Sequence, residues 1–449
     1  METEAETATG FARRAVDALD EREGSGAGAP SSVRRRAFDE FEAMPMPSPE
    51  TEEWRYTDLR DLGLDAYEPF APEPRAETLD DVEPAILEAA GEVGDRAGLA
   101  IQHNSTVVTA HLDAEVDGAG VHFESIDDAL RDHPELLVDR LHAAVPSGRT
   151  RFTALHAAFR TGGTFVLVPR DVKVEAPLQA LTYVDRDGLA VFPHTVIVLE
   201  QGAELTFIDR YVSPDLSNVF SNAVVELYAG PNSRLSYVSL QEWGSGVTHL
   251  AVQRADVDRD AELRSLAVAF GADLSRVEAE SVLRGDGGSS EMLGVYFGDG
   301  EQHLDFRSIQ DHIGSQTSSD LLYKGALRDR SRAIYSGNVV IRQGAHKCNA
   351  YQTNRNILLS DSAKADSIPN LEILSNDPVR CGHAASVGPV DEDTLFYIQS
   401  RGISPDEAER LIVFGFFQEV LDRVRLPEVK AGLEAAIAHE IERAVSHAG

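Results

Sequence analysis

The sequence predicts a mainly β protein with a β-solenoid at its centre, a mixed, mainly helical N-terminal domain and a helical C-terminal domain. Three observations predict this class. Short β-branched strands separated by turn residues follow Gly163, a loose repeat runs through them, and helical spacing of apolar residues dominates both ends. We place the domains at residues 1–160, 161–388 and 389–449.

Composition indicates a folded, very acidic protein. The chain has 449 residues, a formal net charge of −34 and 42% hydrophobic residues, which is enough apolar content for a large core. Arginine dominates the basic residues, and scarce lysine with many acids is typical of proteins from a salt-loving cytosol. Nucleic acid is excluded as a partner because no basic patch offsets the repulsion of phosphates.

The sequence also predicts a soluble, cytoplasmic protein. Its first residues lack the apolar core of a signal peptide, and its longest apolar run, residues 189–199, is too short to span a bilayer. Only two cysteines occur, Cys348 and Cys381. In a reducing compartment both are expected as free thiols.

The first third of the chain reads as helices with a few short strands. Apolar residues recur at helical spacing around 11–19 and 38–44, on either side of a linker-like stretch, Gly24–Ser32. Trp54 and Tyr56 are expected to pin a loop onto the core. Strands within 99–123 and two further helices complete the region, the helices at 125–141 and 152–159.

The central region carries the repeat. Apolar strands are expected at 164–168, 178–184, 195–199 and 205–210. A turn, a small residue, a polar residue and an apolar residue then recur, with the small residue at positions 203, 233, 261, 290 and 331. The steps are 30, 28, 29 and 41 residues. A period in this range indicates a solenoid, and the 41-residue step is expected to contain an inserted loop or an extra strand.

The C-terminal region begins with a short helix at 391–402, which has acids first and Gly402 last. A second helix starts with Ser404 as N-cap and Pro405 at the first position, and a last one carries Val429, Leu433, Ile437 and Ile441. These helices are expected to cover one open end of the solenoid. Phe414, Phe416 and Phe417 add more aromatic surface than a simple cap needs, which favours a docking face for another protein.

Cys381-Gly382-His383 is the candidate metal-binding motif. In a strand, residues two apart point to the same side, so thiolate and imidazole would face one partner, as zinc or iron–sulfur chemistry requires. One such motif supplies two ligands where such sites usually take four. A buried cysteine beside a surface histidine is the alternative.

A complete zinc site is a second alternative. His346-Lys347-Cys348 mirrors the first motif, and the four side chains together would make a Cys2His2 set if successive turns of the solenoid brought them together. The 33-residue separation of the two cysteines need not equal one turn.

Several motifs together resemble the SufB/SufD family of SUF iron–sulfur cluster assembly scaffold proteins. They are Glu-Glu-Trp-Arg-Tyr-Thr-Asp-Leu at 52–59, Gln-Thr-Asn-Arg-Asn at 352–356, Pro-Asn-Leu-Glu-Ile at 369–373, and the stretch from Cys381 to Gly402. The resemblance is dense from about Asp305 to Val424 and looser elsewhere. It implies a right-handed parallel β-helix core, and a C-terminal helical domain that binds the ABC-type ATPase SufC through Phe414, Phe416 and Phe417.

Within that family, the chain matches the branch without the main thiol. SufB carries its principal cysteine six residues before the proline that matches Pro369, where this chain has Ala363. SufB also has Glu-His-Glu where this chain has Cys381-Gly382-His383. The resemblance therefore implies a non-catalytic scaffold that pairs with SufB and shares a transient iron–sulfur cluster at their interface, with His383 as the main iron ligand and Cys381 as a secondary one. No phosphate-binding loop occurs, so ATP would be hydrolysed by SufC and no nucleotide bound here.

Three other functions stay open at this point. The chain could be a SufB-like scaffold that pairs with itself, or a structural protein with an inert Cys/His pair. Parallel β-helices also include carbohydrate-active enzymes, which need acids with arginine or lysine in a cleft. Asp305, Arg307, Asp311 and His312 are the candidates for that role.

Overall fold

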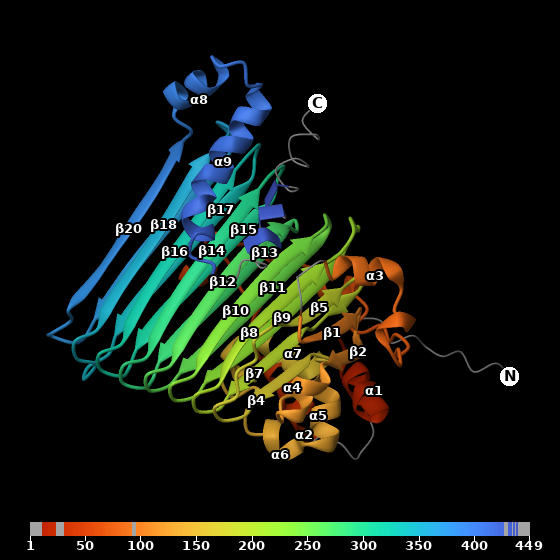
Figure 1. The fold of residues 1–449 in the computed structure, drawn as a ribbon. Coiled ribbons are helices and arrows are strands. Elements are labelled where there is room, and N and C mark those ends of the chain that lie inside the picture. Colours follow the sequence, from red (N-terminus) through yellow and green to blue (C-terminus); the bar gives the residue numbers. More distant parts are fainter. Residues whose placement is uncertain are drawn as a thin grey trace.

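The computed structural model of the chain describes residues 11–23, 31–91, 96–425, 430–432, 434–435 and 437–438. Most of the predicted linker, residues 24–30, lies outside the described residues, as do Val429, Leu433 and Ile441 of the last predicted helix. The described chain forms two large sheets that are stacked into one elongated solenoid, with helices at the N-terminal end and along one side (Figure 1).

Short helices precede and partly cover the solenoid. They are α1 (Arg13–Glu23), α2 (Ser31–Ala43), α3 (Pro84–Ala89), α4 (Ala114–Gly118), α5 (Ile126–Asp132), α6 (Pro134–Leu137) and α7 (Arg151–Phe159), with 3-10 turns η1 (Glu52–Trp54), η2 (Leu64–Ala66), η3 (Leu79–Asp81) and η4 (Ser147–Arg149). The single helix expected between residues 125 and 141 is two helices, because Pro134 has no N–H to continue α5 and instead starts α6.

The first sheet holds β2 (Thr106–Leu112), β1 (Gly98–His103), β5 (Leu178–Tyr183), β8 (Glu204–Val212), β10 (Arg234–Trp243), β12 (Glu262–Gly271), β14 (Ser289–Gly298), β16 (Ser318–Leu327), β18 (Asn349–Leu358) and β20 (Arg380–Pro389), in that order. The second holds β19 (Lys364–Ile373), β17 (Arg332–Ile341), β15 (His303–His312), β13 (Leu274–Leu283), β11 (Val247–Val257), β9 (Val219–Ala229), β7 (His194–Leu199), β4 (Thr164–Val168) and β3 (His122–Ser125), with β6 (Ala190–Val191) beside β9. Successive strands alternate between the sheets from β8 onward, so each turn adds one strand to each sheet. The predicted parallel β-solenoid is confirmed.

The strand register corrects one part of the predicted repeat. One in-register column of the first sheet runs through Glu204, Arg234, Glu262, Ser289, Ser318, Asn349 and Arg380. Ser331, in contrast, precedes the first residue of β17, which belongs to the second sheet. Of the two alternatives expected for the 41-residue step, the inserted loop is wrong and the extra strand is confirmed. That step spans β14, β15 and β16, whereas the earlier steps span two strands each, because it compares turns on opposite sides of a continuous solenoid.

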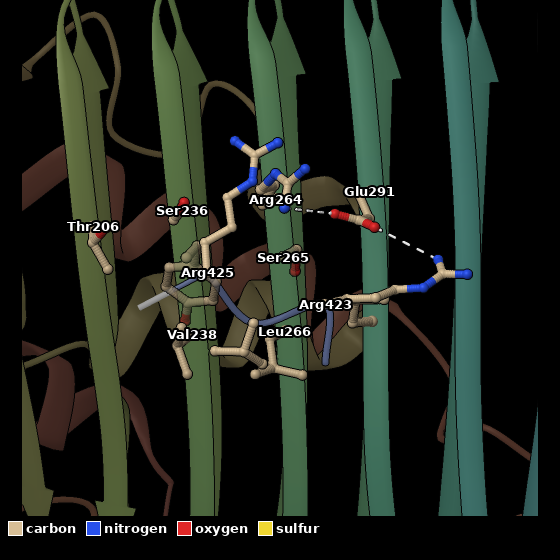
Figure 2. A pocket seen from close by; sticks show the side chains of 12 residues that line it. Thr206, Ser236, Val238, Arg264, Ser265, Leu266, Glu291, Arg423 and Arg425 are labelled. Atoms are coloured by element: carbon tan, nitrogen blue, oxygen red, sulfur yellow. Dashed lines mark ion pairs between the residues drawn. The ribbon is translucent and has the colours of Figure 1, made fainter. Parts of the chain in front are cut away.

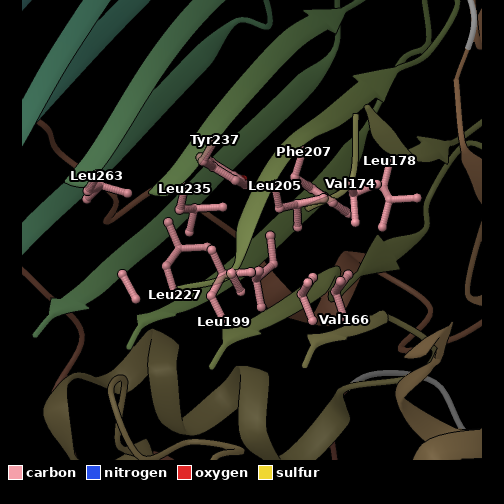
Figure 3. Close-up of a cluster of buried hydrophobic side chains, with 14 of the residues drawn as sticks. Val166, Val174, Leu178, Leu199, Leu205, Phe207, Leu227, Leu235, Tyr237 and Leu263 are labelled. Carbon is pink, nitrogen blue, oxygen red and sulfur yellow. The ribbon is translucent and has the colours of Figure 1, made fainter. Parts of the chain in front are cut away.

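Apolar side chains fill the space between the sheets. Leu205, Leu235 and Leu263 are stacked on successive strands of the first sheet, and Leu199 and Leu227 come from the second (Figure 3). All five are at most 3% exposed. Burying a leucine to this extent contributes about 1.5–3 kcal/mol, and the parallel register repeats that gain in each turn.

The N-terminal segment with the Glu-Glu-Trp motif is attached to the outside of the second sheet. The guanidinium of Arg276, on β13, lies 3.9 Å from the ring centroid of Trp54. The Thr57 hydroxyl donates a 2.6 Å hydrogen bond to Asp305, on β15, and Arg276 forms an ion pair with the same carboxylate. The expectation that Trp54 pins a loop onto the core is confirmed.

The C-terminal helices were expected to cover one open end of the solenoid, and α9 instead lies on its side. α8 (Glu392–Gln399) and α9 (Pro405–Leu421) follow β20, and Ser404 caps α9 by accepting a hydrogen bond from the Glu407 backbone N–H. Val413, Phe417 and Val420 of α9 pack against apolar residues on the outer face of β14 and β16. α9 thus covers the outside of the first sheet, because its apolar stripe needs a flat apolar surface, and the last turn is left uncovered within the described residues (Figure 1).

Candidate functional site

The last turn of the solenoid ends in two edge strands. Among the described residues, β20 pairs only with β18, and β19 pairs only with β17. Strands farther inside are mostly buried, whereas β19 and β20 contain only intermediate and exposed residues. Both edges therefore present backbone N–H and C=O groups without a neighbouring strand, which is a template for another chain.

Cys381 and His383 point toward the interior column of the solenoid at this open end. Cys381 is in register with Ala350, and His383 is in register with Gln352. Ala350 and Gln352 are buried between the sheets, and in-register neighbours of a parallel sheet point the same way. The predicted orientation of the pair is therefore confirmed. His383 is exposed because no further turn covers it.

The two side chains differ in their surroundings. Cys381 packs at the margin of an apolar cluster that contains Cys348, Val339 and Ile341. Burial, and secondarily the nearby Cys348, raises the pKa of the Cys381 thiol, so the thiol is protonated at neutral pH. A metal ion that binds Cys381 must therefore displace that proton. The imidazole of His383 is exposed, so an incoming ion can reach it directly.

The four-ligand zinc site is not assembled. Cys348 is fully buried and lies 3.2 Å from the Thr317 hydroxyl. The His346 imidazole is exposed and lies 2.8 Å from an Asp377 carboxylate oxygen. Within the described chain, His346, Cys348, Cys381 and His383 do not supply three donor atoms within 4.8 Å of one another. Both cysteines are free thiols.

A row of buried amides lies on β18, the strand next to β20, and its first member, Gln352, is in register with His383. Gln352 accepts a hydrogen bond from the Tyr335 hydroxyl and donates one to the backbone carbonyl of Asn370 on β19. Asn354 donates to the Tyr296 hydroxyl, and Asn356 donates to Asn354. The Gln-Thr-Asn-Arg-Asn motif thus places its amides inside and its other side chains outside. The sequence analysis named this motif but did not predict that its amides form buried hydrogen bonds. The amides recur at every second residue, which is the pattern of one face of a strand and could have indicated this role.

Exposed apolar side chains surround the open end. Ile373 ends β19, Leu374 follows it, Val379 precedes β20, and Val387 lies on β20, with exposed fractions of 43%, 52%, 71% and 41%. Four large apolar residues on one end of the molecule, together with two open edges, make a surface suited to another protein chain.

The residues proposed for carbohydrate chemistry do not form a cleft. Asp305 is fully buried and held by Arg276 and Thr57, with Arg307 3.5 Å away. Asp311 forms an ion pair with Arg342, and His312 is buried between two hydroxyl groups, those of Thr317 and Ser319. All four side chains make ion pairs or hydrogen bonds with other residues of the fold and do not line a cleft together. The structure therefore offers no active site at these residues for a carbohydrate-active enzyme.

The three C-terminal phenylalanines have different environments. Phe417 is fully buried against the first sheet, which makes it a core residue. Phe414 and Phe416 are half-buried at the margin of the same cluster, and the Lys324 ammonium lies 4.7 Å from the Phe416 ring centroid. The more exposed aromatic side chains are on α8: Phe396 is 73% exposed and Tyr397 55%.

The segment after α9 is held on the sheet by ion pairs. Figure 2 shows Arg423 beside Glu291, which also pairs with Arg264 at 3.1 Å. Arg423 further pairs with Asp320 at 2.6 Å, and Arg425 pairs with Glu262 at 3.2 Å. These contacts fix the direction in which the chain leaves α9, across the outer face of the first sheet.

No helix in the described part of the chain has both the length and the apolar composition needed to cross a membrane.

Two family models match the chain. The one described as "SUF system FeS cluster assembly, SufBD core domain" matches residues 182–416, and "SufBD protein N-terminal region" matches residues 96–180.

Similar proteins agree with these matches. The iron–sulfur cluster assembly protein SufD of Bacillus subtilis is 32% identical over 417 residues, which are 92% of this chain and 94% of that protein. An iron–sulfur cluster assembly SufBD family protein of Mycobacterium tuberculosis is 35% identical over 66% of this chain and 75% of its own length. A SufBD family protein of Staphylococcus saprophyticus is 28% identical over 86% of this chain and 84% of its own length. The core model covers more than half of the sequence, and the chain therefore belongs to the SufBD family of the SUF iron–sulfur cluster assembly system.

Proposed function

We propose that the chain is a SufD-type scaffold subunit that pairs with SufB through β19 and β20 and shares a nascent iron–sulfur cluster at that interface. The observation that carries the proposal is the open last turn, where Cys381 and His383 point into the space between the sheets and no further turn of the described chain covers them. The cluster is the cargo of the assembly. The chain itself is non-catalytic in this proposal.

Pairing is supported by the two edges and their apolar margin. A partner that adds strands to β19 and β20 would satisfy the unpaired backbone groups and bury Val379 and Val387. A second β-solenoid of the same family has matching strand spacing, because its turns repeat the same geometry. SufB fits this requirement, and a second copy of this chain is the alternative.

Ligand number supports a shared cluster. Clusters of this kind usually take four protein ligands, and this end supplies one imidazole and one thiol. We assign His383 as the main iron ligand because it is exposed, and Cys381 as a secondary ligand because burial keeps its thiol protonated. A partner chain must then supply the remaining ligands.

We further propose that the ATPase SufC docks on α8 and the adjoining face of α9. The support is the exposure of Phe396 and Tyr397 on α8 and of Leu411 on α9, with Phe414 and Phe416 half-buried beside them. ATP hydrolysis is assigned to SufC. Free thiols at both cysteines are compatible with a cytoplasmic assembly, which we also propose.

The pairing proposal is tested by size-exclusion chromatography of the chain with SufB at high salt. Val387→Asp places an unpaired charge in the proposed interface and should weaken pairing about 100-fold or more, since an uncompensated buried charge costs about 3–5 kcal/mol. Val138→Asp is the matched control, because Val138 is 49% exposed just after α6 and outside the proposed interface. Equal pairing of both variants would refute the proposed interface, and a stable dimer of the chain alone would favour self-pairing.

A further inference from the structure

Three histidines from distant parts of the chain meet beside the N-terminal end of the solenoid. His142 lies in the loop after α6, His156 lies on α7, and His194 is the first residue of β7. The ring centroids of His142 and His156 are each 4.9 Å from that of His194 and 5.8 Å from each other. One ring nitrogen from each residue lies within 4.8 Å of the other two.

Hydrogen bonds fix which nitrogen carries the proton on two of these rings. His156 Nε2 lies 3.1 Å from the carbonyl oxygen of Pro193, and His194 Nε2 lies 3.0 Å from a carboxylate oxygen of Glu226. A carbonyl or an ionised carboxylate only accepts, so both Nε2 atoms donate. A buried, neutral imidazole then has its lone pair on Nδ1.

Both of those Nδ1 atoms are buried without a partner. His156 and His194 are at most 1% exposed, and neither Nδ1 has a hydrogen-bond partner among the described residues. Buried acceptors without a partner are uncommon and call for an explanation such as an ion. Two such lone pairs beside a third imidazole are an arrangement that a metal ion would satisfy.

Glu226 is held rigidly behind His194. Its carboxylate accepts hydrogen bonds from the backbone N–H groups of His142, Ala144 and Val145, at 2.7–2.9 Å. The same carboxylate therefore orients His194 and shapes the loop that carries His142. Carboxylates and backbone carbonyls that bind the far nitrogen of a histidine are the usual outer partners of metal-ligating imidazoles.

We propose that His142, His156 and His194 bind one Zn²⁺ ion, with Glu226 and Pro193 as outer hydrogen-bond partners. Three imidazoles suit zinc and neighbouring transition metals and do not suit Mg²⁺ or Ca²⁺, which prefer oxygen ligands. Zinc–imidazole bonds of ~2.0–2.1 Å draw the three rings inward and leave a fourth position for water. The ion would tie the loop after α6, α7 and β7 together, far from His383 and independent of the proposed cluster.

The test uses the full-length chain, first stripped with a chelator and then titrated with Zn²⁺ and with Co²⁺. One equivalent of each ion should bind, Co²⁺ should show the visible bands of a tetrahedral site, and Zn²⁺ should raise the melting temperature. His142→Asn removes a ligand at a half-buried loop position with a positive φ of 59°, which asparagine tolerates, so the fold should survive. It should weaken Zn²⁺ binding by more than the ~10–100-fold that loss of an outer partner costs.

His122→Asn is the matched control. His122, Glu124 and His133 form a second, less buried group of metal-ligating side chains. Loss of the bound equivalent in His142→Asn together with its retention in His122→Asn supports the proposal. No binding to the unaltered chain, or unchanged binding and Co²⁺ bands in a folded His142→Asn variant, would overturn it and leave a packed cluster of neutral histidines.

Discussion

Phe417 and Phe396 provide a matched test of which C-terminal aromatic residues hold the fold and which are available to a partner. Phe417 is fully buried between α9 and the outer face of β14 and β16, whereas Phe396 on α8 is 73% exposed. Truncating a buried phenylalanine to alanine costs about 3–5 kcal/mol, because apolar contacts are lost and a cavity remains. An exposed substitution usually changes stability by less than about 0.5 kcal/mol.

Hydrogen exchange of the α9 amides measures this difference locally. Phe417→Ala should accelerate exchange by about 100-fold or more if exchange occurs through undocking of α9, since each 1.4 kcal/mol is a factor of ten. Phe396→Ala should leave α9 exchange unchanged and weaken SufC binding. Unchanged exchange in Phe417→Ala would refute its place in the core, and unchanged SufC binding by Phe396→Ala would refute docking on α8.

Three further predictions concern stability. Burial lowers the pKa of His312 to about 4, so the unfolded state binds a proton at a higher pH than the folded state does. The free energy of unfolding should therefore fall by about 3 kcal/mol as pH falls from about 6.5 to about 4. Urea unfolding of His312→Asn should lack this part of the pH dependence. Thr57→Val removes the hydroxyl that donates to buried Asp305 and should cost about 1.5–3 kcal/mol, whereas Thr51→Val, at an exposed hydroxyl, should cost less than about 0.5 kcal/mol in the same assay. Because the net charge is −34, the melting temperature should rise with KCl as repulsion is screened, and a melting temperature that falls with added KCl would contradict this.

The local features that sequence reasoning identified correctly are those with a short-range cause. Ser404 and Pro405 predict the start of α9 because a side-chain cap and a fixed φ act within one turn. The motif around Cys381 predicts its own orientation because strand geometry alternates residue by residue. The turns before Glu204, Arg234 and Glu262 share one pattern because they occupy one column of the same sheet.

The features that were missed depend on which distant segments meet. Ser331 resembles the turns of the first sheet because both sides of a solenoid use similar turns, so composition cannot assign it to a side. The apolar stripe of α9 predicts that this face of the helix packs against other residues. It does not predict whether the helix packs on the open end of the solenoid or on the outer face of a sheet. His142, His156 and His194 share no spacing, and only the tertiary fold brings them together.

The central claim is that His383, at the open end, binds iron of a cluster shared with SufB. The most direct measurement is iron and sulfide content of the complex with SufB and SufC after anaerobic purification, comparing His383→Ala with His346→Ala. His346 is the matched control because it is an exposed histidine of the neighbouring turn whose imidazole lies against Asp377. We predict that His383→Ala keeps SufB pairing but loses most of the iron and sulfide, and that His346→Ala retains both. Normal cluster content in the His383→Ala complex would contradict the claim.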